Sequence, residues 1–457
     1  METTSGPVIG HPHPNCPQVR RFVGIPYAAP PVGELFLRHP QPVRPWTAPR
    51  DCQGPAPTPQ RRHYSANSLW KDPIIPGEEI LNLTVTAPLS GTDLPVLVWI
   101  HGGGFKAGTA NSPITDPYRF ASEGVVCVSV SYRLGVEGFA HLPGTDPNRG
   151  LVDQQAALRW VQENIAAFGG DPGRVTIAGQ SAGGGSVLAH LVAPASNELF
   201  QSAISMSGVL PACSEQEAAR RAQVFAAQAQ ARGTWPLSHM SDAAVEAELA
   251  TEASLYIPTT DPVEYVRQRA RREPLSDLPF TPFQEPTVMP LSVEDGVEAG
   301  KGDDVRLLLT ATTEEFTDLC LAHGPLLDPH PAPELFARAG VAWRPRYQRA
   351  FQAGAPTSLV VGMFLDDVFF PDFMAQLKQW RAQRGVDTQT HFFDWCPARS
   401  STVAVPPAQA YARHCMDMPF VFDTVADPQA QLLVGDNPPR QLVEDNHRRW
   451  LEFITGA

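Results

Sequence analysis

Six short runs of the chain are dominated by Val, Ile, Leu and other apolar residues. They cover residues 94–100, 124–132, 174–179, 202–208, 304–311 and 388–395. In the first four runs the apolar residues are nearly continuous and do not alternate with polar ones. Strands that are buried on both faces, as in a parallel sheet, have this pattern. All six runs are predicted to be strands, and the first four are predicted to be central strands of the sheet.

Between these runs the apolar residues recur with the period of an α-helix. In segment 150–169 the residues Leu151, Leu158 and Val161 fall on one helical face, and two glycines end the pattern. Strands that alternate with helices predict an α/β fold, with a mostly parallel central sheet and helices on both faces. Further helices are predicted at residues 186–193, 214–232, 241–255, 358–384 and 441–454.

Residues 214–300 differ from the rest of the chain. They are rich in Ala, Glu and Arg and contain no strong strand pattern. We interpret them as a helical insertion that packs over the sheet, within a single domain that spans residues 1–457. A separate second domain is the less favoured alternative.

The stretch TIAGQSAGGGSV follows the third apolar run and contains a serine between two glycines. Ser181 lies between Gly179 and Gly183, at a junction that is predicted to run from strand through a sharp turn into a helix. A nucleophile elbow has this context, because small neighbours allow the strained turn that exposes the serine hydroxyl. The alternative is a glycine-rich turn of a cofactor-binding fold, although neither GxGxxG nor GxxxxGK[ST] occurs. By itself the five-residue pattern leaves both interpretations open.

A second glycine-rich segment, HGGGFKAG, comes directly after the first apolar run. In esterases of the HGGG type, backbone N–H groups of this loop bind the carbonyl oxygen of the ester, together with the N–H after the nucleophile. We therefore predict Gly103, Gly104 and Ala182 as the donors of an oxyanion hole. Three glycines alone would more often be a flexible turn. The pairing of HGGG with a later GxSxG, each after its own strand, favours the oxyanion hole.

With these motifs the chain resembles the type-B carboxylesterases, the family of bacterial para-nitrobenzyl esterases, vertebrate carboxylesterases and cholinesterases. The resemblance covers most of the chain and is carried by segments 22–46, 130–140, 148–184 and 414–423. The helical middle region matches only loosely. The resemblance implies an α/β-hydrolase fold with helical insertions over the active site. It also implies a serine carboxylesterase that hydrolyses short-chain or aryl esters through an acyl-enzyme.

The resemblance also implies the other two members of a catalytic triad. In the family the acid is a glutamate in a motif that ends Asp-Glu-Gly, and LLLTATTEEFTD occupies that place here. Glu315 then corresponds to the acid and Glu314 to the aspartate before it, while Phe316 replaces the glycine. Otherwise the two glutamates are a solvated charge at a helix start. The base corresponds to His414 in YARHCMDMPFVF, and the order Ser181, Glu315, His414 is that of the α/β-hydrolases.

Three features depart from the family pattern. Gln180 replaces a glutamate before the nucleophile. The side chain at this position points into the protein, so the amide needs hydrogen-bond partners, and we expect activity to survive. Thr58 and Ile80 occupy the positions of a disulfide found in secreted members, so that bridge cannot form. The chain stops after WLEFITGA, earlier than relatives do, and we expect an edge of the sheet to be missing or closed by a partner.

Composition narrows the expected partners and location. The net charge of −13 argues against nucleic acid, because phosphate binding needs a basic patch. No apolar run approaches the length of a membrane span. The seven cysteines include no CxxC pair, which indicates neither a disulfide framework nor a zinc site. Without a signal-peptide pattern we expect a cytoplasmic protein, monomeric or homodimeric, that binds a small-molecule ester and needs no metal or organic cofactor.

Two rival functions and several residues stay open at this level. A non-catalytic protein of the neuroligin branch would share the fold, but those relatives have lost the nucleophile that this chain keeps. A lipase or amidase would use the same triad, and the absence of a long apolar lid makes the lipase the weaker option. Phe105, Phe369 and Phe370 fit either pocket walls or core. Asp366 and Asp367 fit either a solvated helix start or the wall of the site.

Overall fold

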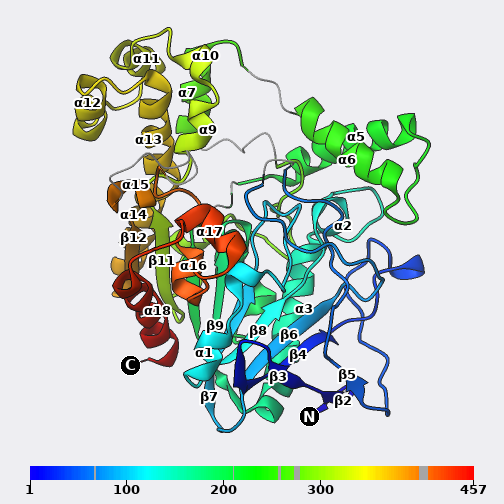
Figure 1. The fold of residues 1–457 in the computed structure, drawn as a ribbon. Coiled ribbons are helices and arrows are strands. Elements are labelled where there is room, and N and C mark those ends of the chain that lie inside the picture. The colour runs from blue at the N-terminus through cyan, green and yellow to red at the C-terminus, as the bar shows by residue number, and fades with distance from the viewer. Residues whose placement is uncertain are drawn as a thin grey trace.

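The computed structural model describes residues 1–65, 68–208, 210, 212–255, 259–271, 278–400 and 410–456. Within these ranges a nine-stranded sheet forms the centre, with the order β12-β11-β10-β9-β7-β8-β6-β4-β3 (Figure 1). The first six strands of this order are parallel: β12 (Thr388–Phe393), β11 (Arg306–Thr312), β10 (Ser202–Met206), β9 (Gly170–Gln180), β7 (Leu94–Ile100) and β8 (Val126–Val130). The other three are antiparallel: β6 (Asn82–Pro88), β4 (Cys16–Pro26) and β3 (His11–His13). A small second sheet contains β1 (Glu2–Thr3), β2 (Gly6–Ile9) and β5 (Arg50–Asp51).

The six apolar runs of the sequence are the six parallel strands, so that prediction is confirmed. The continuous apolar pattern has a simple cause in β7. Val96 and Val98 face one hydrophobic cluster, whereas Leu97 and Trp99 face another on the opposite side of the sheet. All four side chains are buried. The antiparallel strands β3, β4 and β6 were not predicted, because their segments mix apolar residues with Pro, Arg and Thr.

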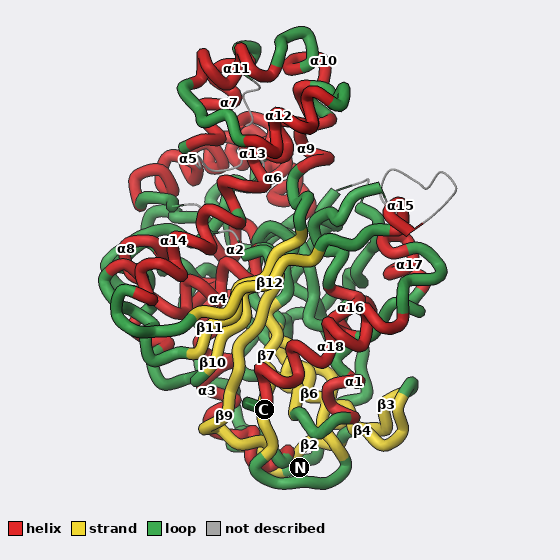
Figure 2. The backbone as a smooth tube through the Cα atoms, turned by 90° about the vertical axis from the view of Figure 1, so that its left-hand side faces the viewer, coloured by secondary structure: helices red, strands yellow, loops and turns green. Residues whose placement is uncertain are grey.

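Helices cover both faces of the sheet, as Figure 2 shows. One face carries α3 (Arg149–Asn164), α4 (Ala182–Val192), α8 (Val293–Glu298) and α14 (Pro371–Ala382). The other face carries α1 (Tyr118–Ser122), α16 (Met418–Phe422) and α18 (Arg440–Thr455). The remaining short elements are α2 (Gly135–Phe139), α15 (Pro397–Ser400), α17 (Pro428–Val434), and the 3-10 turns Gly33–Leu35, Pro113–Thr115, Ile165–Phe168 and Pro194–Ser196. None of the helices in the described ranges combines the length and apolar character that crossing a membrane requires.

Two groups of helices lie beyond one end of the sheet (Figure 1). One group is the pair α5 (Glu215–Ala231) and α6 (Asp242–Leu255). The other contains α7 (Pro262–Ala270), α9 (Thr317–Leu321), α10 (Gly324–Leu327), α11 (Ala332–Ala339), α12 (Pro345–Gln352) and α13 (Thr357–Phe369). The helices of segment 214–300 therefore divide among three places: α5 and α6 form the first group, α7 joins the second because it packs against α11 and α13, and α8 packs on the sheet face against α4 and α14. Its role as one insertion, and the single domain over 1–457, stay predictions.

The helix predicted over 358–384 is wrong as a single element. The chain forms α13 up to Phe369 and α14 from Pro371, with Phe370 between them at φ −121° and ψ −75°. The ring of Pro371 clashes with a helical carbonyl before it and removes one N–H donor. The proline was visible in the sequence, and it divides the apolar pattern into two helices.

Candidate active site

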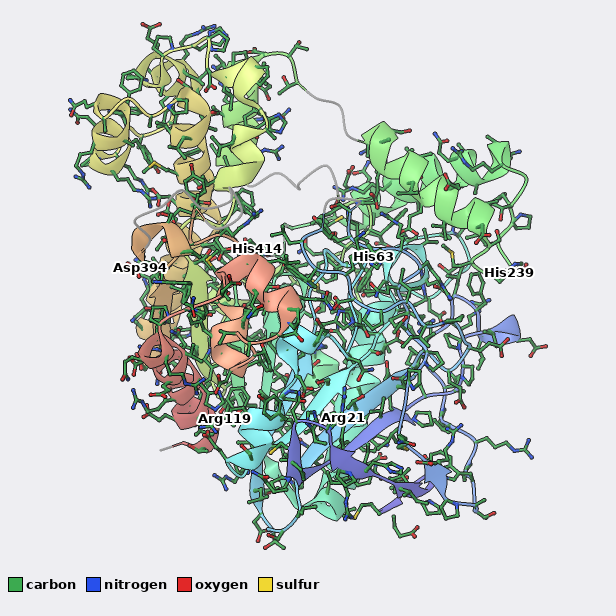
Figure 3. The ribbon with its side chains drawn as sticks, in the orientation of Figure 1. Arg21, His63, Arg119, His239, Asp394 and His414 are labelled. Carbon is green, nitrogen blue, oxygen red and sulfur yellow. The ribbon has the colours of Figure 1, made fainter. Side chains whose placement is uncertain are left out.

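The parallel strands bring distant segments to one edge of the sheet. Because β7, β9 and β11 share a direction, the HGGG loop, Ser181 and the Glu314–Glu315 pair follow their carboxyl ends at the same edge. A bridge between Glu314 and Arg413 brings the segment of His414 to this edge as well. Figure 3 shows His414 at the upper end of the sheet body, at the base of the helical groups.

Ser181 occupies a sharp turn between β9 and α4. Its backbone has φ 57° and ψ −120°, a conformation that non-glycine residues rarely adopt. The turn is held by Met206, whose carbonyl accepts a hydrogen bond from Ser181 N at 2.9 Å. It also needs close packing, since a Cβ on Gly183 would lie 2.0 Å from the carbonyl oxygen of Ile100. The local structure is thus the strained strand–turn–helix that the GxSxG pattern predicts.

The structure brings Glu315, and not Glu314, against the histidine. Glu315 Oε2 pairs with His414 Nδ1. The other oxygen, Oε1, accepts hydrogen bonds from Thr312 N at 2.7 Å and from Ser207 Oγ at 2.5 Å. Glu315 is buried, and these contacts fix its carboxylate. Ser207 was not predicted, and a lone serine after a strand gives little signal in the sequence.

Glu314 points elsewhere. Its Oε2 accepts hydrogen bonds from Thr313 Oγ1 and from the N–H of Ala412, both at 2.9 Å. The neighbouring glutamates therefore have separate surroundings, and only Glu315 pairs with the imidazole of His414. Neither carboxylate is the solvated charge at a helix start that the alternative interpretation requires.

Asp366 supports the turn that follows Glu315. Its Oδ1 accepts a hydrogen bond from the N–H of Phe316 at 2.6 Å, and its Oδ2 accepts one from Thr317 Oγ1 at 3.1 Å. Burial, together with the nearby charge of Glu315, raises the pKa of Asp366 well above its ordinary value. Its neighbour Asp367 is also buried and pairs with Arg346. Neither aspartate is solvated, and neither lines the cavity described below.

The aromatic residues considered as pocket walls belong to the core. Phe105, Phe369 and Phe370 are 1%, 3% and 1% exposed and do not line the cavity. Phe316, which replaces the family's glycine, packs its ring against Phe369 and Phe370. Its ring centroid also lies 6.2 Å from that of His414. Phe316 thus lies between His414 and the aromatic core residues Phe369 and Phe370.

The HGGG loop presents backbone donors beside Ser181. Gly103 has φ 107°, and a Cβ there would lie 2.2 Å from the carbonyl oxygen of Ala107, so the position requires glycine. The carbonyl of Gly103 accepts from Lys106 N and Ala107 N inside the loop. No residue in the described ranges accepts a hydrogen bond from the N–H groups of Gly103, Gly104 or Ala182. These groups are the free donors that an oxyanion hole needs.

The side-chain amide of Gln180 finds its partners in His414 and Cys415. Its side chain is 2% exposed, and Nε2 donates to His414 Nε2 and to Cys415 Sγ, both at 3.2 Å. Among the described residues no hydrogen bond joins Ser181 Oγ to His414, and the amide of Gln180 occupies the lone pair of Nε2. The imidazole therefore has a partner on each ring nitrogen, Glu315 at Nδ1 and Gln180 at Nε2.

The surroundings of His414 set the direction of its pKa. Burial lowers the pKa of His414, but Cys415 and Glu315 beside the ring raise it by more. The net pKa lies well above the ordinary value of 6.5. Asp417 is buried close by, and burial and the charge of Glu315 raise its pKa to about 7. The site therefore favours positive charge on the imidazole, which is the charge that it acquires when it accepts a proton.

A cavity of about 330 Å³ opens onto these residues. Ser181 and His414 line it together with the HGGG loop and Gln180. The rest of the lining comes from several residues within segments 60–65, 68–72 and 107–115, from Trp99, and from Arg413, Cys415, Met418 and Leu433. The volume falls at the small end of the range for sites that bind small molecules. In the described part of the chain, no three His, Cys, Asp or Glu side chains are grouped as metal ligands.

Comparison with known proteins gives consistent matches over the chain. The model of the carboxylesterase family matches residues 1–325. The para-nitrobenzyl esterase of Bacillus subtilis (strain 168) is 31% identical over 453 residues, which cover 95% of this chain and 86% of that protein. Acetylcholinesterase 4 of Caenorhabditis briggsae and the cocaine esterase of Oryctolagus cuniculus are 40% and 45% identical over 42% of this chain. These two matches span only 33% and 38% of the animal proteins.

Solved structures agree with the sequence comparisons. A PNB esterase superposes with a TM-score of 0.78 at 26% identity, over 99% of this chain and 90% of that chain. The carboxylesterase EST55 of Geobacillus stearothermophilus superposes with a TM-score of 0.77 at 27% identity, with the same coverage. The similarity extends over nearly the whole of this chain.

Proposed function

The chain belongs to the carboxylesterase family and has the α/β-hydrolase fold, and on this basis we propose that it hydrolyses short-chain or aryl esters with a Ser181–His414–Glu315 triad. Membership of the family makes it a carboxylic-ester hydrolase. The roles of individual residues and the class of ester are the proposal. We also propose, as the sequence analysis expects, a monomeric or homodimeric protein of the cytoplasm that binds neither nucleic acid nor membrane.

The proposed mechanism begins at the imidazole. Glu315 holds the proton on Nδ1 of His414, so Nε2 keeps its lone pair and acts as the base. Ser181 passes its proton to Nε2 as the hydroxyl oxygen attacks the ester carbonyl. The N–H groups of Gly103, Gly104 and Ala182 bind the oxyanion that develops. Because Nε2 is held by Gln180 in the free protein, that amide must yield when Ser181 engages the base.

Collapse of the tetrahedral intermediate completes the first half of the reaction. His414 returns the proton from Nε2 to the leaving alcohol, and the acyl group stays on Ser181. Water then attacks the acyl-enzyme by the same route. The imidazolium that forms twice in this cycle is stabilised by Glu315.

One observation carries the proposal. The buried carboxylate of Glu315 pairs with Nδ1 of His414, which lines one cavity with the strained Ser181 and the HGGG loop. Within the described ranges the N–H groups of Gly103, Gly104 and Ala182 have no acceptor. A glycine-rich turn without a catalytic role has no need of this combination. The small cavity supports substrates with short acyl or single-ring groups.

A fluorophosphonate probe tests the nucleophile. We expect one probe per chain, attached to the peptide that contains Ser181, because the phosphorus mimics the carbonyl carbon under attack. The adduct is located by mass spectrometry after digestion. Attachment to a different residue, or full esterase activity in protein that takes up no probe, would contradict the assignment.

A series of nitrophenyl esters of increasing acyl length tests the substrate class. We expect kcat/KM to be highest for short acyl chains and to fall for chains too long for the cavity. The rates are measured by release of nitrophenol at fixed pH. A maximum at long acyl chains would indicate a lipase and contradict the proposed class.

Gln180→Glu tests the electrostatics of the base. The neutral form of His414 is the active one, so the rate falls as pH drops through its pKa, which lies above 6.5. A carboxylate in place of the amide adds a negative charge about 3 Å from Nε2 and stabilises the imidazolium. The acid limb of the kcat/KM profile should therefore move to higher pH by about one unit or more. Gln180→Met, which adds no charge, serves as the control and should show no such rise.

A further inference from the structure

The thiol of Cys415 lies beside His414 but takes no part in the proposed mechanism. Cys415 directly follows His414 in the chain, lines the cavity and is 8% exposed. The other six cysteines all belong to the described ranges, are buried as well, and do not line the cavity. The sulfur of Cys415 therefore belongs to the surroundings of the active site, unlike the other thiols.

The backbone of Cys415 adopts an unfavourable conformation. Its φ of 74° lies in the left-handed region, which a residue with a Cβ rarely adopts and which glycine adopts readily. Strain of this kind persists only where the surrounding structure imposes it, and it is concentrated at functional sites. The chain therefore places a thiol at a position where the backbone favours glycine.

One amide group joins this thiol to the imidazole of His414. Gln180 Nε2 donates to His414 Nε2 and to Cys415 Sγ, each at 3.2 Å. The NH₂ group carries two hydrogens, so each hydrogen has one acceptor. Among the described residues these two atoms are the acceptors recorded for Gln180 Nε2, and the Gln180 side chain is 2% exposed.

The proposed reaction requires the amide of Gln180 to give up one of its two partners. Ser181 passes its proton to His414 Nε2, so the amide must leave that nitrogen. A buried N–H group without any partner is costly, because it loses its hydrogen bond and regains none from water. With Cys415 Sγ in place, the amide keeps one hydrogen bond while Ser181 engages His414. Without the sulfur, His414 Nε2 would be the last partner of the amide, and Ser181 would have to displace it.

We propose that Cys415 is a positioning residue, whose sulfur holds the amide of Gln180 while Ser181 takes over Nε2 of His414. The inference rests on the proposed function and adds one residue to it. Cys415 acts through Gln180 and transfers neither a proton nor an acyl group. Both half-reactions use Nε2, so the sulfur affects turnover and not the binding of the ester.

Removal of the sulfur is the first test. We expect Cys415→Ala to lower kcat for a nitrophenyl ester by about tenfold, the size of one hydrogen bond, with KM within about twofold of the wild type. Labelling of Ser181 by a fluorophosphonate should slow by the same factor. Cys415→Gly should show the same losses, and it relieves the left-handed backbone if Cys415→Ala fails to fold. Wild-type rates in a folded variant would overturn the proposal.

The decisive test repeats this change in a chain without the amide. In Gln180→Met nothing competes with Ser181 for His414 Nε2, so the sulfur has no amide to hold. We expect Cys415→Ala to change kcat and the labelling rate by less than about twofold in this background, against about tenfold in the wild type. A tenfold loss in both backgrounds would mean that the sulfur only packs against the site, and it would overturn the proposal.

Two further variants separate the hydrogen bond from the loss of a thiol. Cys415→Ser keeps an acceptor and should recover most of the lost rate, whereas a serine variant as slow as Cys415→Ala would contradict the proposal. Cys127→Ala is the matched control. Cys127 is a buried thiol of the same hydrophobic cluster, contacts the carbonyl of Pro117 and does not line the cavity. Its kcat should equal that of the wild type, and a tenfold loss there would assign the effect to packing.

Failure of this inference is distinguishable from failure of the proposed function. If the probe labels Ser181 equally fast in the wild type and in Cys415→Ala, the esterase activity stands and the role of Cys415 is wrong. If the wild type hydrolyses esters but takes up no probe at Ser181, the proposed triad is wrong and the role of Cys415 falls with it.

Discussion

Ser181→Ala is expected to lower kcat for ester hydrolysis by about 10⁶-fold and to abolish labelling by a fluorophosphonate. The variant removes the atom that would form the acyl-enzyme and leaves the backbone of the elbow able to form. Ser181 N bonds to Met206 O, and Ser181 O accepts from Gly185 N, so both bonds survive the change. The measurement is turnover of a nitrophenyl ester together with probe uptake.

A matched control separates loss of chemistry from loss of fold. Ser186 is a buried serine on α4, and its hydroxyl accepts a hydrogen bond from Gln154 Nε2 at 3.1 Å. Ser186→Ala is expected to lower the melting temperature by a few degrees and to keep turnover within a few-fold of the wild type. Labelling that persists in Ser181→Ala would rule out Ser181 as the nucleophile.

Glu315→Gln is expected to lower kcat by about 10⁴-fold, the effect of removing the acid of a triad while its geometry stays intact. The hydrogen bonds of the Glu315 carboxylate explain the size of this loss in kcat. Oε1 accepts from Thr312 N and Ser207 Oγ, so the amide oxygen of the variant must take that position. The NH₂ group then faces Nδ1 of His414, which must become an acceptor. The ring proton moves to Nε2, where it blocks the base.

Glu314→Gln is the control for this experiment. Glu314 Oε2 accepts from Thr313 Oγ1 and Ala412 N, and an amide oxygen can accept both hydrogen bonds. We therefore expect turnover within a few-fold of the wild type. Both variants are compared by kcat on one nitrophenyl ester, with circular dichroism to verify the fold. A large loss in Glu314→Gln with a small loss in Glu315→Gln would mean that the two roles are reversed.

Much of the architecture was accessible from local patterns. The continuous apolar run of β7 predicts a strand that is buried on both faces. Its side chains point alternately to the two faces of the sheet, so apolar residues at every position must be covered by a layer of helices on each face. The elbow at Ser181 and the HGGG loop are also contiguous in sequence, so their glycines predict close backbone packing directly. The antiparallel strands β4 and β6 were missed because their mixed composition resembles that of loops.

The choice between the glutamates came from family resemblance and not from the residues themselves. Glu314 and Glu315 have identical side chains and adjacent positions, so no local pattern separates them. The structure separates them by their partners, since only Glu315 meets His414. That contact joins residues 99 positions apart in the chain.

The sequence by itself determined the parallel strands and the glycine-rich turns, and through its resemblance to a family it predicted a triad in the order Ser181, Glu315, His414. Only the tertiary structure decided that Gln180 holds Nε2 of His414, a contact across 234 positions of the chain. It alone also placed residues of segments 60–65 and 68–72 around one cavity with the HGGG loop and His414. The physical reason is that strands and turns depend on neighbouring residues, whereas side-chain contacts depend on which strand ends converge at an edge of the sheet. The spacing of residues along the chain does not show which strand ends come together.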